Sequence, residues 1–308
     1  MQLFRNSINL SVKFPHGSVV TVGNYDGVHL GHQKILSQLV SKAKELNLPS
    51  VVVIFEPQPE EFFSEHHAIS RLCCLREKLR LLKEAGIENV ICLHFNSKFS
   101  ELSAEQFVAQ ILVAALQVRY LIVGHDFVFG HNSTGDINLL RKASNKYGFA
   151  VEEISACMLN GVRISSSLIR AAVASGDFKL AEKFLGRPYS LSGKVVHGDK
   201  RGRDLAFPTA NVYLSHLVLP LTGVFVVRVL GLDKAYFGVA NVGVRPTIED
   251  TKKLLEVYIF NFNAEIYGKF ICVEFLHKLR EEKKFASFAL LKKQIAKDVI
   301  NAQKFLGV

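Results

Sequence analysis

The chain lacks several short signatures that would have identified its function at once. Neither a GxxxxGK[ST] nor a GxGxxG pattern occurs in its 308 residues, so an ordinary P-loop site or dinucleotide-binding site has no support. None of the five cysteines forms a C-x-x-C pair, so we do not expect a structural zinc site. Their odd number and scattered positions favour reduced thiols.

Long apolar runs are also missing. No run reaches the length of a membrane span, and the first residues lack the basic, apolar and small-residue order of a secretion signal. We therefore expect a cytoplasmic protein without a membrane partner. The length suits two domains, and a hydrophobic fraction of 49% is enough for two cores.

The net charge of +10 is unevenly distributed. From Arg187 onward the chain has 19 Lys and Arg against 11 Asp and Glu, and much of this excess lies in 278–304. There it alternates with apolar residues, as on the solvated face of a helix, and it would also favour anionic phosphate ligands. Because no recognised nucleic-acid motif is present, we expect no nucleic-acid partner. Weak self-association is left open.

The first part of the sequence alternates strand-like and helix-like segments. We expect strands at 18–22, 50–55, 89–94, 120–124 and 150–154, and helices at 33–47, 75–85, 104–117 and 136–147. This alternation predicts an α/β, Rossmann-like domain whose parallel sheet is covered on both faces. Ligands of such sheets bind beyond the carboxyl ends of the strands, so the loops after them should form one site.

The pattern changes near Gly186-Arg187-Pro188. Six short strand-like runs follow, at 190–196, 210–214, 223–230, 235–242, 255–261 and 270–277, and they predict an antiparallel barrel. The segment 285–305 is amphipathic and predicts a terminal helix. Its apolar stripe consists of Phe288, Leu291, Ile295, Val299 and Ile300. The predicted domains are 1–185 and 186–308.

The most informative motif is GNYDGVHLGH at 23–32, between the first strand and the first helix. His29 and His32 are three residues apart, so they would share one face beside the positive end of that helix. Gly23 and Gly27 would let the backbone approach a ligand closely. We interpret the motif as a site for a phosphate chain; the alternative is a glycine-rich turn with two incidental histidines.

Three further loops follow predicted strands. In FEPQP (55–59) two prolines stiffen the loop, and the following Phe62 and Phe63 either stack on a flat ring or belong to the core. In VGHDFVFG (123–130), Asp126 is expected to be a buried carboxylate that holds a ligand rather than caps a turn. In VRISSSLIR (162–170), Arg163 and Arg170 flank Ser165–Ser167. The arginines and serines together would bind a polyphosphate. The alternative is that the serines only cap a helix, and both roles can hold at once.

These four motifs, in this order, resemble the adenylyltransferase module of bacterial bifunctional riboflavin kinase/FAD synthetases. The resemblance implies that His29 and His32 stabilise charge on the α-phosphate and the leaving pyrophosphate. It further implies two sets of binding residues. ATP would contact Gly23, Asn24, Asp26, Gly31, Arg163, Ser166, Ser167 and Arg170, and the flavin would contact Phe55, Pro57, Phe63 and Asp126. Departures from the family pattern occur at Gln58, Asn132, Ser133 and Leu168.

The second domain has one segment dense in chemistry, GKVVHGDKRGRDLAFPTAN at 193–211. Its glycines and basic residues, including Gly198 and Lys200, predict a cationic loop. Thr209 and Asn211 offer hard oxygen ligands suited to Mg²⁺ that carries a nucleotide phosphate, unless they belong to an ordinary Pro-Thr-x-Asn turn. Glu256 interrupts an apolar strand; by spacing alone it is equally a solvent-facing residue or a general base.

The region from Gly193 onward is similar to the riboflavin kinase module of the same family, except that Ala206 replaces a usual glycine. This similarity implies that Gly193, Gly198, Lys200, Thr209 and Asn211 bind Mg-ATP. It also implies that Glu256 accepts the proton of the riboflavin 5′-hydroxyl. The expected protein converts riboflavin to FMN and then FMN to FAD, with ATP as co-substrate and Mg²⁺ as cofactor. The alternative is a riboflavin kinase whose adenylyltransferase activity is weak or lost.

Overall fold

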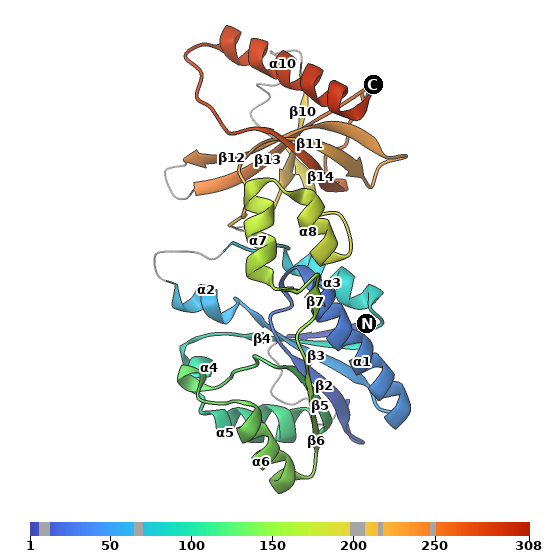
Figure 1. Cartoon of the computed structure of the whole chain (residues 1–308), viewed down its shortest axis with the longest axis vertical. Coiled ribbons are helices and arrows are strands. Elements are labelled where there is room, and N and C mark those ends of the chain that lie inside the picture. The colour runs from blue at the N-terminus through green and yellow to red at the C-terminus, as the bar shows by residue number, and fades with distance from the viewer. Residues whose placement is uncertain (6–12, 65–69, 198–206, 215–217, 247–250) are drawn as a thin grey trace. The chain divides into compact units, whose positions relative to one another are not determined.

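A six-stranded parallel sheet forms the centre of the first part of the chain in the computed structural model (Figure 1). Its strand order is β1-β4-β3-β2-β5-β6. The strands are β1 (Gln2–Arg5), β2 (Ser18–Val22), β3 (Ser50–Glu56), β4 (Asn89–His94), β5 (Val118–Gly124) and β6 (Ala150–Ile154). The five predicted strands are confirmed. The edge strand β1 was not predicted, because its four largely exposed residues give no apolar run.

Helices cover both faces of this sheet, as predicted (Figure 1). On one face, α1 (Leu30–Leu46) packs on β2 and buries Leu36, Leu39 and Ala43. On the other, α5 (Ala104–Gln106), its wider π-helical continuation η3 (Phe107–Ala115) and α6 (Ile137–Tyr147) share one apolar core with the sheet. α3 (Leu75–Glu84) buries Leu81 and Leu82.

Several short elements follow the strands of this sheet. They are η2 (Asp26–Val28), α2 (Pro59–Phe63), α4 (Ser97–Ser100), η4 (His131–Ser133) and the hairpin of β7 (Met158–Leu159) with β8 (Val162–Arg163). Because the strands are parallel, the loops after β2, β3, β4 and β5 leave the same edge of the sheet.

The second part of the chain contains the predicted six-stranded antiparallel barrel, which is closed in the order β10-β13-β12-β11-β14-β9. Its strands are β9 (Ser190–Val196), β10 (Thr209–Tyr213), β11 (Gly223–Leu230), β12 (Tyr236–Pro246), β13 (Thr251–Ile259) and β14 (Phe270–Arg280). Alternate residues such as Val227, Ala240 and Val257 are completely buried, as the two-residue period of a strand requires.

Two helices precede the barrel; the second packs on β14, and the first packs on the second. They are α7 (Ser166–Ser175) and α8 (Phe178–Leu185). The chain forms two compact units, Met1–Ile69 with Lys78–Ser165, and Ser70–Glu77 with Ser166–Val308. The boundary between these units lies before α7, whereas the sequence predicts functional domains that divide after residue 185. That functional division stays a prediction.

Aromatic and polar contacts explain this grouping. The ring of Phe178 lies 5.7 Å from the rings of Phe225 and Phe275, which come from β11 and β14. The hydroxyl of Ser190 on β9 donates to the Glu77 carboxylate over 3.1 Å, so the segment 70–77 is anchored on the barrel as well.

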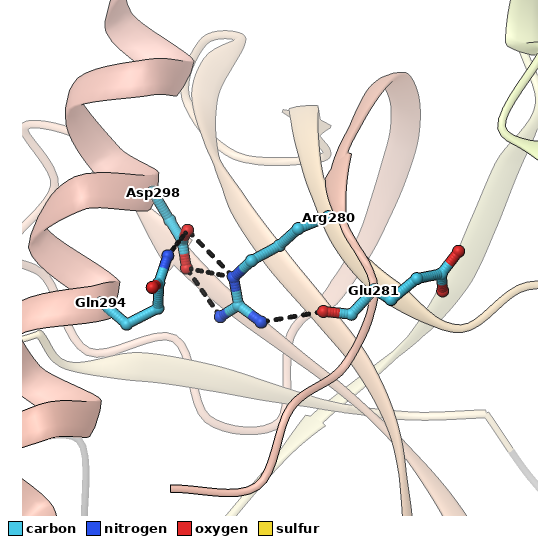
Figure 2. A network of polar contacts seen from close by, with 4 residues as sticks. All are labelled: Arg280, Glu281, Gln294 and Asp298. Atoms are coloured by element: carbon cyan, nitrogen blue, oxygen red, sulfur yellow. Dashed lines mark hydrogen bonds and ion pairs between the residues drawn. The ribbon is translucent and has the colours of Figure 1, made fainter.

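The predicted terminal helix is present as α10 (Phe288–Leu306) and lies along the outside of the barrel (Figure 1). The predicted apolar stripe was partly wrong, because Phe288 and Ile300 are largely exposed. The helix instead buries Ala302 and Asp298. Asp298 is buried because Arg280 of β14 neutralises it (Figure 2).

The structure describes residues 1–5, 13–64, 70–197, 207–214, 218–246 and 251–308, with side chains outside 244–254. Within these ranges, no helix is long and apolar enough to cross a membrane.

Candidate active sites

The two imidazoles of the HLGH motif lie face to face. The rings of His29 and His32 are stacked, with centroids 3.6 Å apart and planes 15° apart. α1 begins at Leu30, three residues earlier than the sequence predicts, so His29 is the N-cap and His32 lies in the first turn. The expectation that both rings share one face is confirmed.

The hydrogen bond of the N-cap determines which ring nitrogen of His29 carries the proton. Nδ1 accepts from the backbone N–H of His32 over 3.3 Å. A neutral His29 therefore carries its proton on Nε2. Gly31 explains how the ring fits there, because a Cβ at Gly31 would lie 3.1 Å from the His29 ring. The glycine between the two histidines thus leaves space for the first imidazole.

Tyr25, in the turn before the histidine pair, contacts both β2 and His32. Tyr25 is buried; its hydroxyl is 2.7 Å from Thr21 Oγ1, and its ring centroid is 4.9 Å from that of His32. Burial raises the pKa of the Tyr25 hydroxyl, more than the hydrogen bond with Thr21 lowers it. Gly23, Asn24 and Asp26 surround it in the chain, and Asp26 is also buried.

An aromatic cavity of about 450 Å³ opens at the carboxyl edge of the sheet. Its wall is formed by residues at the carboxyl ends of four strands and in the loops after them. They include Val22, Phe55, Phe63, Phe95, Phe99, Phe127, Asn132 and Ser133. The volume and the apolar wall suit a flat aromatic ligand. The sequence did not single out Phe95 or Phe99, although each is an aromatic residue just after a predicted strand.

The two neighbouring phenylalanines after the proline loop have different environments. Phe62 packs against the apolar core, whereas Phe63 is 64% exposed and lines the cavity. The core position expected as one alternative thus fits Phe62, and the position beside a flat ligand fits Phe63. Pro57 follows Glu56 through a cis peptide bond. Gln58 is buried and caps α2: its backbone N–H donates to Glu61 over 3.0 Å.

Asp126 differs from its prediction. It is exposed rather than buried, because it lies beyond the end of β5, and its carboxylate forms an ion pair with Arg163 of β8. His125 Nδ1 lies 3.7 Å from the same carboxylate. Two predicted site residues from separate motifs are therefore brought together, and each supplies the counter-charge of the other.

Ser166, Ser167 and Arg170 belong to the first turns of α7, in the unit that contains the barrel. Ser166 and Arg170 are four residues apart and therefore lie on the same side of α7.

On the barrel, three polar side chains lie side by side on neighbouring strands. Asn211 of β10 is directly opposite Glu256 of β13, and Glu256 is opposite Asn241 of β12. Thr209 is two residues from Asn211 and shares its face. Leu255 and Val257 on either side of Glu256 are completely buried inside the barrel. Glu256 and the polar residues beside it therefore lie on the outer face. Further along the same face, α10 packs over Val239 and Tyr258.

The side-chain carbonyl of Asn211 stands out on this face. Asn211 is 7% exposed, and its Oδ1 atom has no hydrogen-bond partner among the described residues. A buried carbonyl without a donor is costly unless a ligand uses it. Gly193 lies on β9 opposite Ile271. Gly198, Lys200 and Ala206 lie outside the described residues.

The first unit is a parallel sheet whose first helix begins with a pair of stacked histidines. The second is a closed barrel that carries Thr209, Asn211 and Glu256 on one face. Together they fit the class of two-module, nucleotide-dependent transferases. Two family models match the chain: FAD synthetase over residues 11–168, and riboflavin kinase over residues 185–306.

Full-length relatives agree with both matches. The chain is 45% identical to the bifunctional riboflavin kinase/FMN adenylyltransferase of Escherichia coli (strain K12), over 100% of this chain and 99% of that protein. It is 46% identical to the Haemophilus influenzae protein of the same name, over the full length of both. The chain belongs to the bifunctional riboflavin kinase/FMN adenylyltransferase family.

A solved structure with the same fold is the macrolide-efflux protein from Streptococcus pneumoniae. It has a TM-score of 0.79 and 32% identity, and the match covers 97% of both chains.

Proposed function

We propose that the chain catalyses both reactions of its family. The barrel unit transfers the γ-phosphoryl group of ATP to riboflavin, which gives FMN and ADP. The sheet unit joins the phosphate of FMN to the α-phosphorus of a second ATP, which gives FAD and pyrophosphate. The observation that carries this proposal is the stacked pair of His29 and His32, at the same sheet edge as the aromatic cavity.

In the adenylylation step, a phosphate oxygen of FMN attacks the α-phosphorus and the bond to the β-phosphate oxygen breaks. Negative charge increases on the α-phosphate and on the leaving pyrophosphate. The Nε2 proton of His29 and the ring of His32 stabilise that charge, a contribution of about 3 kcal/mol per donor in comparable sites. This step requires no covalent intermediate with the enzyme. Gly23, Asn24, Asp26 and Gly31 form the turn that holds the nucleotide.

Basic and hydroxyl groups would contribute to the binding of phosphates. Arg163 would neutralise phosphate charge, with Asp126 holding its guanidinium in place. Ser166, Ser167 and Arg170 are proposed as phosphate contacts as well, on the strength of their positions at the start of α7.

The flavin ring would occupy the aromatic cavity. Phe55 and Phe63 lie in its wall, and Pro57 follows Phe55 at the end of β3. Ring stacking is worth about 0.5–1.5 kcal/mol beyond area burial. Asn132 and Ser133, which depart from the family pattern, also line the cavity, so they would tune flavin affinity.

In the kinase step, Glu256 would take the proton of the riboflavin 5′-hydroxyl. Thr209 and Asn211 would hold Mg²⁺, which would neutralise the charge of the phosphates when bound. The orphan Oδ1 of Asn211 fits this role, because a neutral oxygen donor suits a cation whose negative ligands are phosphates. Gly193, Gly198 and Lys200 are proposed as further ATP contacts. Partners are riboflavin, FMN and ATP, and the proposed location is the cytoplasm.

Two assays distinguish this proposal from a kinase without adenylyltransferase activity. Riboflavin with Mg-ATP should yield FMN and FAD, and FMN supplied directly should yield FAD. His29→Ala should lower FAD formation by about 100-fold and leave FMN formation unchanged. FMN as the final product of the parent protein would establish the alternative. No turnover of either flavin would refute both activities.

A further inference from the structure

A lysine is completely buried beneath the histidine turn. The side chain of Lys78 on α3 is 0% exposed, and its ammonium group donates to the backbone carbonyl of Asn24 over 2.5 Å. Asn24 lies 54 residues away in the sequence. The contact therefore joins α3 to the turn that leads into His29.

That turn has an unusual backbone. Tyr25 has φ 49°, Gly27 has φ 75° and Val28 has φ 40°. Left-handed backbone at a tyrosine and a β-branched valine is strained and persists only where surrounding contacts impose it. One such contact is a hydrogen bond from Gln33 Nε2 to the carbonyl of Val28 over 2.9 Å. Another is the 2.7 Å hydrogen bond between Tyr25 and Thr21.

The ammonium of Lys78 is an expensive way to supply such a contact. Removal of a charged group from water costs several kcal/mol. Lys78 lies on the face of α3 that also buries Leu81 and Leu82, where an apolar side chain would pack without that cost. The benefit of the lysine must then come from what its ammonium holds, and the acceptor is the carbonyl of Asn24, at the start of the strained turn.

We propose that Lys78 is a positioning residue for adenylylation. Its ammonium fixes Asn24, and thereby fixes the turn from Tyr25 to Val28 and the stacked pair that follows it. The inference rests on the proposed role of His29 and His32. It assigns Lys78 no contact with either substrate. A shift of about 1 Å in a positioned catalytic group can cost about 100-fold in rate.

The test uses the full-length protein and its two activities. Lys78→Met removes the ammonium and keeps the length of the side chain. We expect kcat for FAD formation from FMN to fall by about 10- to 100-fold, with FMN formation from riboflavin unchanged. Lys83→Met is the matched control, since Lys83 is an exposed residue of the same helix; it should change neither activity.

A spectroscopic measurement separates positioning from general destabilisation. The imidazole NMR signals of His29 and His32 should shift in Lys78→Met. Those of His277, stacked on Phe305 in the barrel unit, should not. Tyr25→Phe removes a second anchor of the turn with little change of shape. It should lower FAD formation several-fold, which keeps the inference testable if Lys78→Met folds poorly.

The outcomes distinguish the inference from the function on which it rests. If His29→Ala abolishes FAD formation while both Lys78→Met and Tyr25→Phe retain the parent rate, the positioning role is wrong and the site assignment stands. If His29→Ala retains FAD formation, the site assignment itself is wrong. Equal losses of both activities in Lys78→Met, with unshifted histidine signals, would also overturn the positioning role.

Discussion

Arg280 and Asp298 form a bidentate ion pair that ties the last barrel strand to the terminal helix (Figure 2). Arg280 Nε and Nη2 lie 3.0 and 2.8 Å from Asp298 Oδ2. Gln294 Nε2 donates to Oδ1 of the same carboxylate over 2.8 Å, and Arg280 Nη1 donates to the carbonyl of Glu281 over 3.0 Å. The buried charges are thus neutralised and hydrogen-bonded.

Loss of this pair should destabilise the barrel strongly. Asp298→Ala leaves a mostly buried guanidinium without its counter-charge, so we expect the free energy of unfolding to fall by about 3–5 kcal/mol. Urea denaturation followed by circular dichroism measures this. Glu84→Ala, which breaks the exposed pair with Arg80, is the control and should cost less than about 1 kcal/mol. Equal effects of the two variants would show that the buried pair has no special weight.

Gly31→Ala should impair FAD formation selectively. The new methyl group would press on the His29 ring, so the ring must move by a few tenths of an ångström. We expect kcat for FAD formation to fall by about tenfold or more, since displaced catalytic groups are costly, with FMN formation unchanged. Alanine favours a helix more than glycine does, so the stability of α1 should not decrease. An unchanged rate would mean that the ring tolerates the methyl group.

Substitutions of Phe63 and Phe107 should affect different properties: flavin binding in the first case and folding stability in the second. Phe63 is exposed and lines the cavity, so Phe63→Ala should raise KM for FMN by up to about tenfold and change stability little. Phe107 lines the same cavity but is buried in the core, and Phe107→Ala should cost about 3–5 kcal/mol of unfolding free energy. Steady-state kinetics and denaturation of both variants test the pair. An unchanged KM in Phe63→Ala would remove that ring from the flavin site.

Asn211 should show a trade-off between function and stability. Asn211→Leu removes the orphan carbonyl, so FMN formation should be lost while the free energy of unfolding rises by up to about 1 kcal/mol. Chelation of Mg²⁺ should abolish FMN formation in the parent protein. FAD formation from FMN, measured in the variant with Mg²⁺ present, should be unchanged. Retained FMN formation would exclude Asn211 as a metal ligand.

Cys272 should react slowly with thiol reagents. Burial raises the pKa of its thiol, more than hydrogen bonds with Ser192 and Ser190 lower it. Less thiolate is then present at a given pH, so iodoacetamide should label Cys272 more slowly in the folded protein than in urea, as peptide mapping can measure. The unfolded chain loses this proton first as the pH rises, so the thiol lowers folding stability above its ordinary pKa. Equal labelling rates would contradict this.

Strong local patterns made most of the fold predictable. Apolar runs such as 50–55 and the amphipathic period of 33–47 each decide one element, and their alternation decides the sheet. That His29 and His32 share one face was predictable as well, because it depends on a spacing of three residues, whereas the stacking of their rings is seen only in the structure. Edge strand β1 was missed, since neighbours rather than its own residues stabilise it.

Pairings between distant residues could not be predicted in the same way. Asp126 meets Arg163 across 37 residues, and Asp298 meets Arg280 on another element. In each case an acidic residue acquires its environment from a partner that no local period identifies. The one available signal for Lys78 was its place on the apolar face of an amphipathic helix, where a charge is unexpected.

The position of α8 determines where the protein could be divided into separate fragments. A fragment that begins at residue 186, where the sequence places the second domain, would lose Phe178 and expose the aromatic rings of Phe225 and Phe275. A fragment that begins at Ser166 would keep α8 but would still lack Glu77, the partner of Ser190. Neither cut therefore keeps all the contacts described for the barrel unit, because that unit includes both α8 and the segment 70–77.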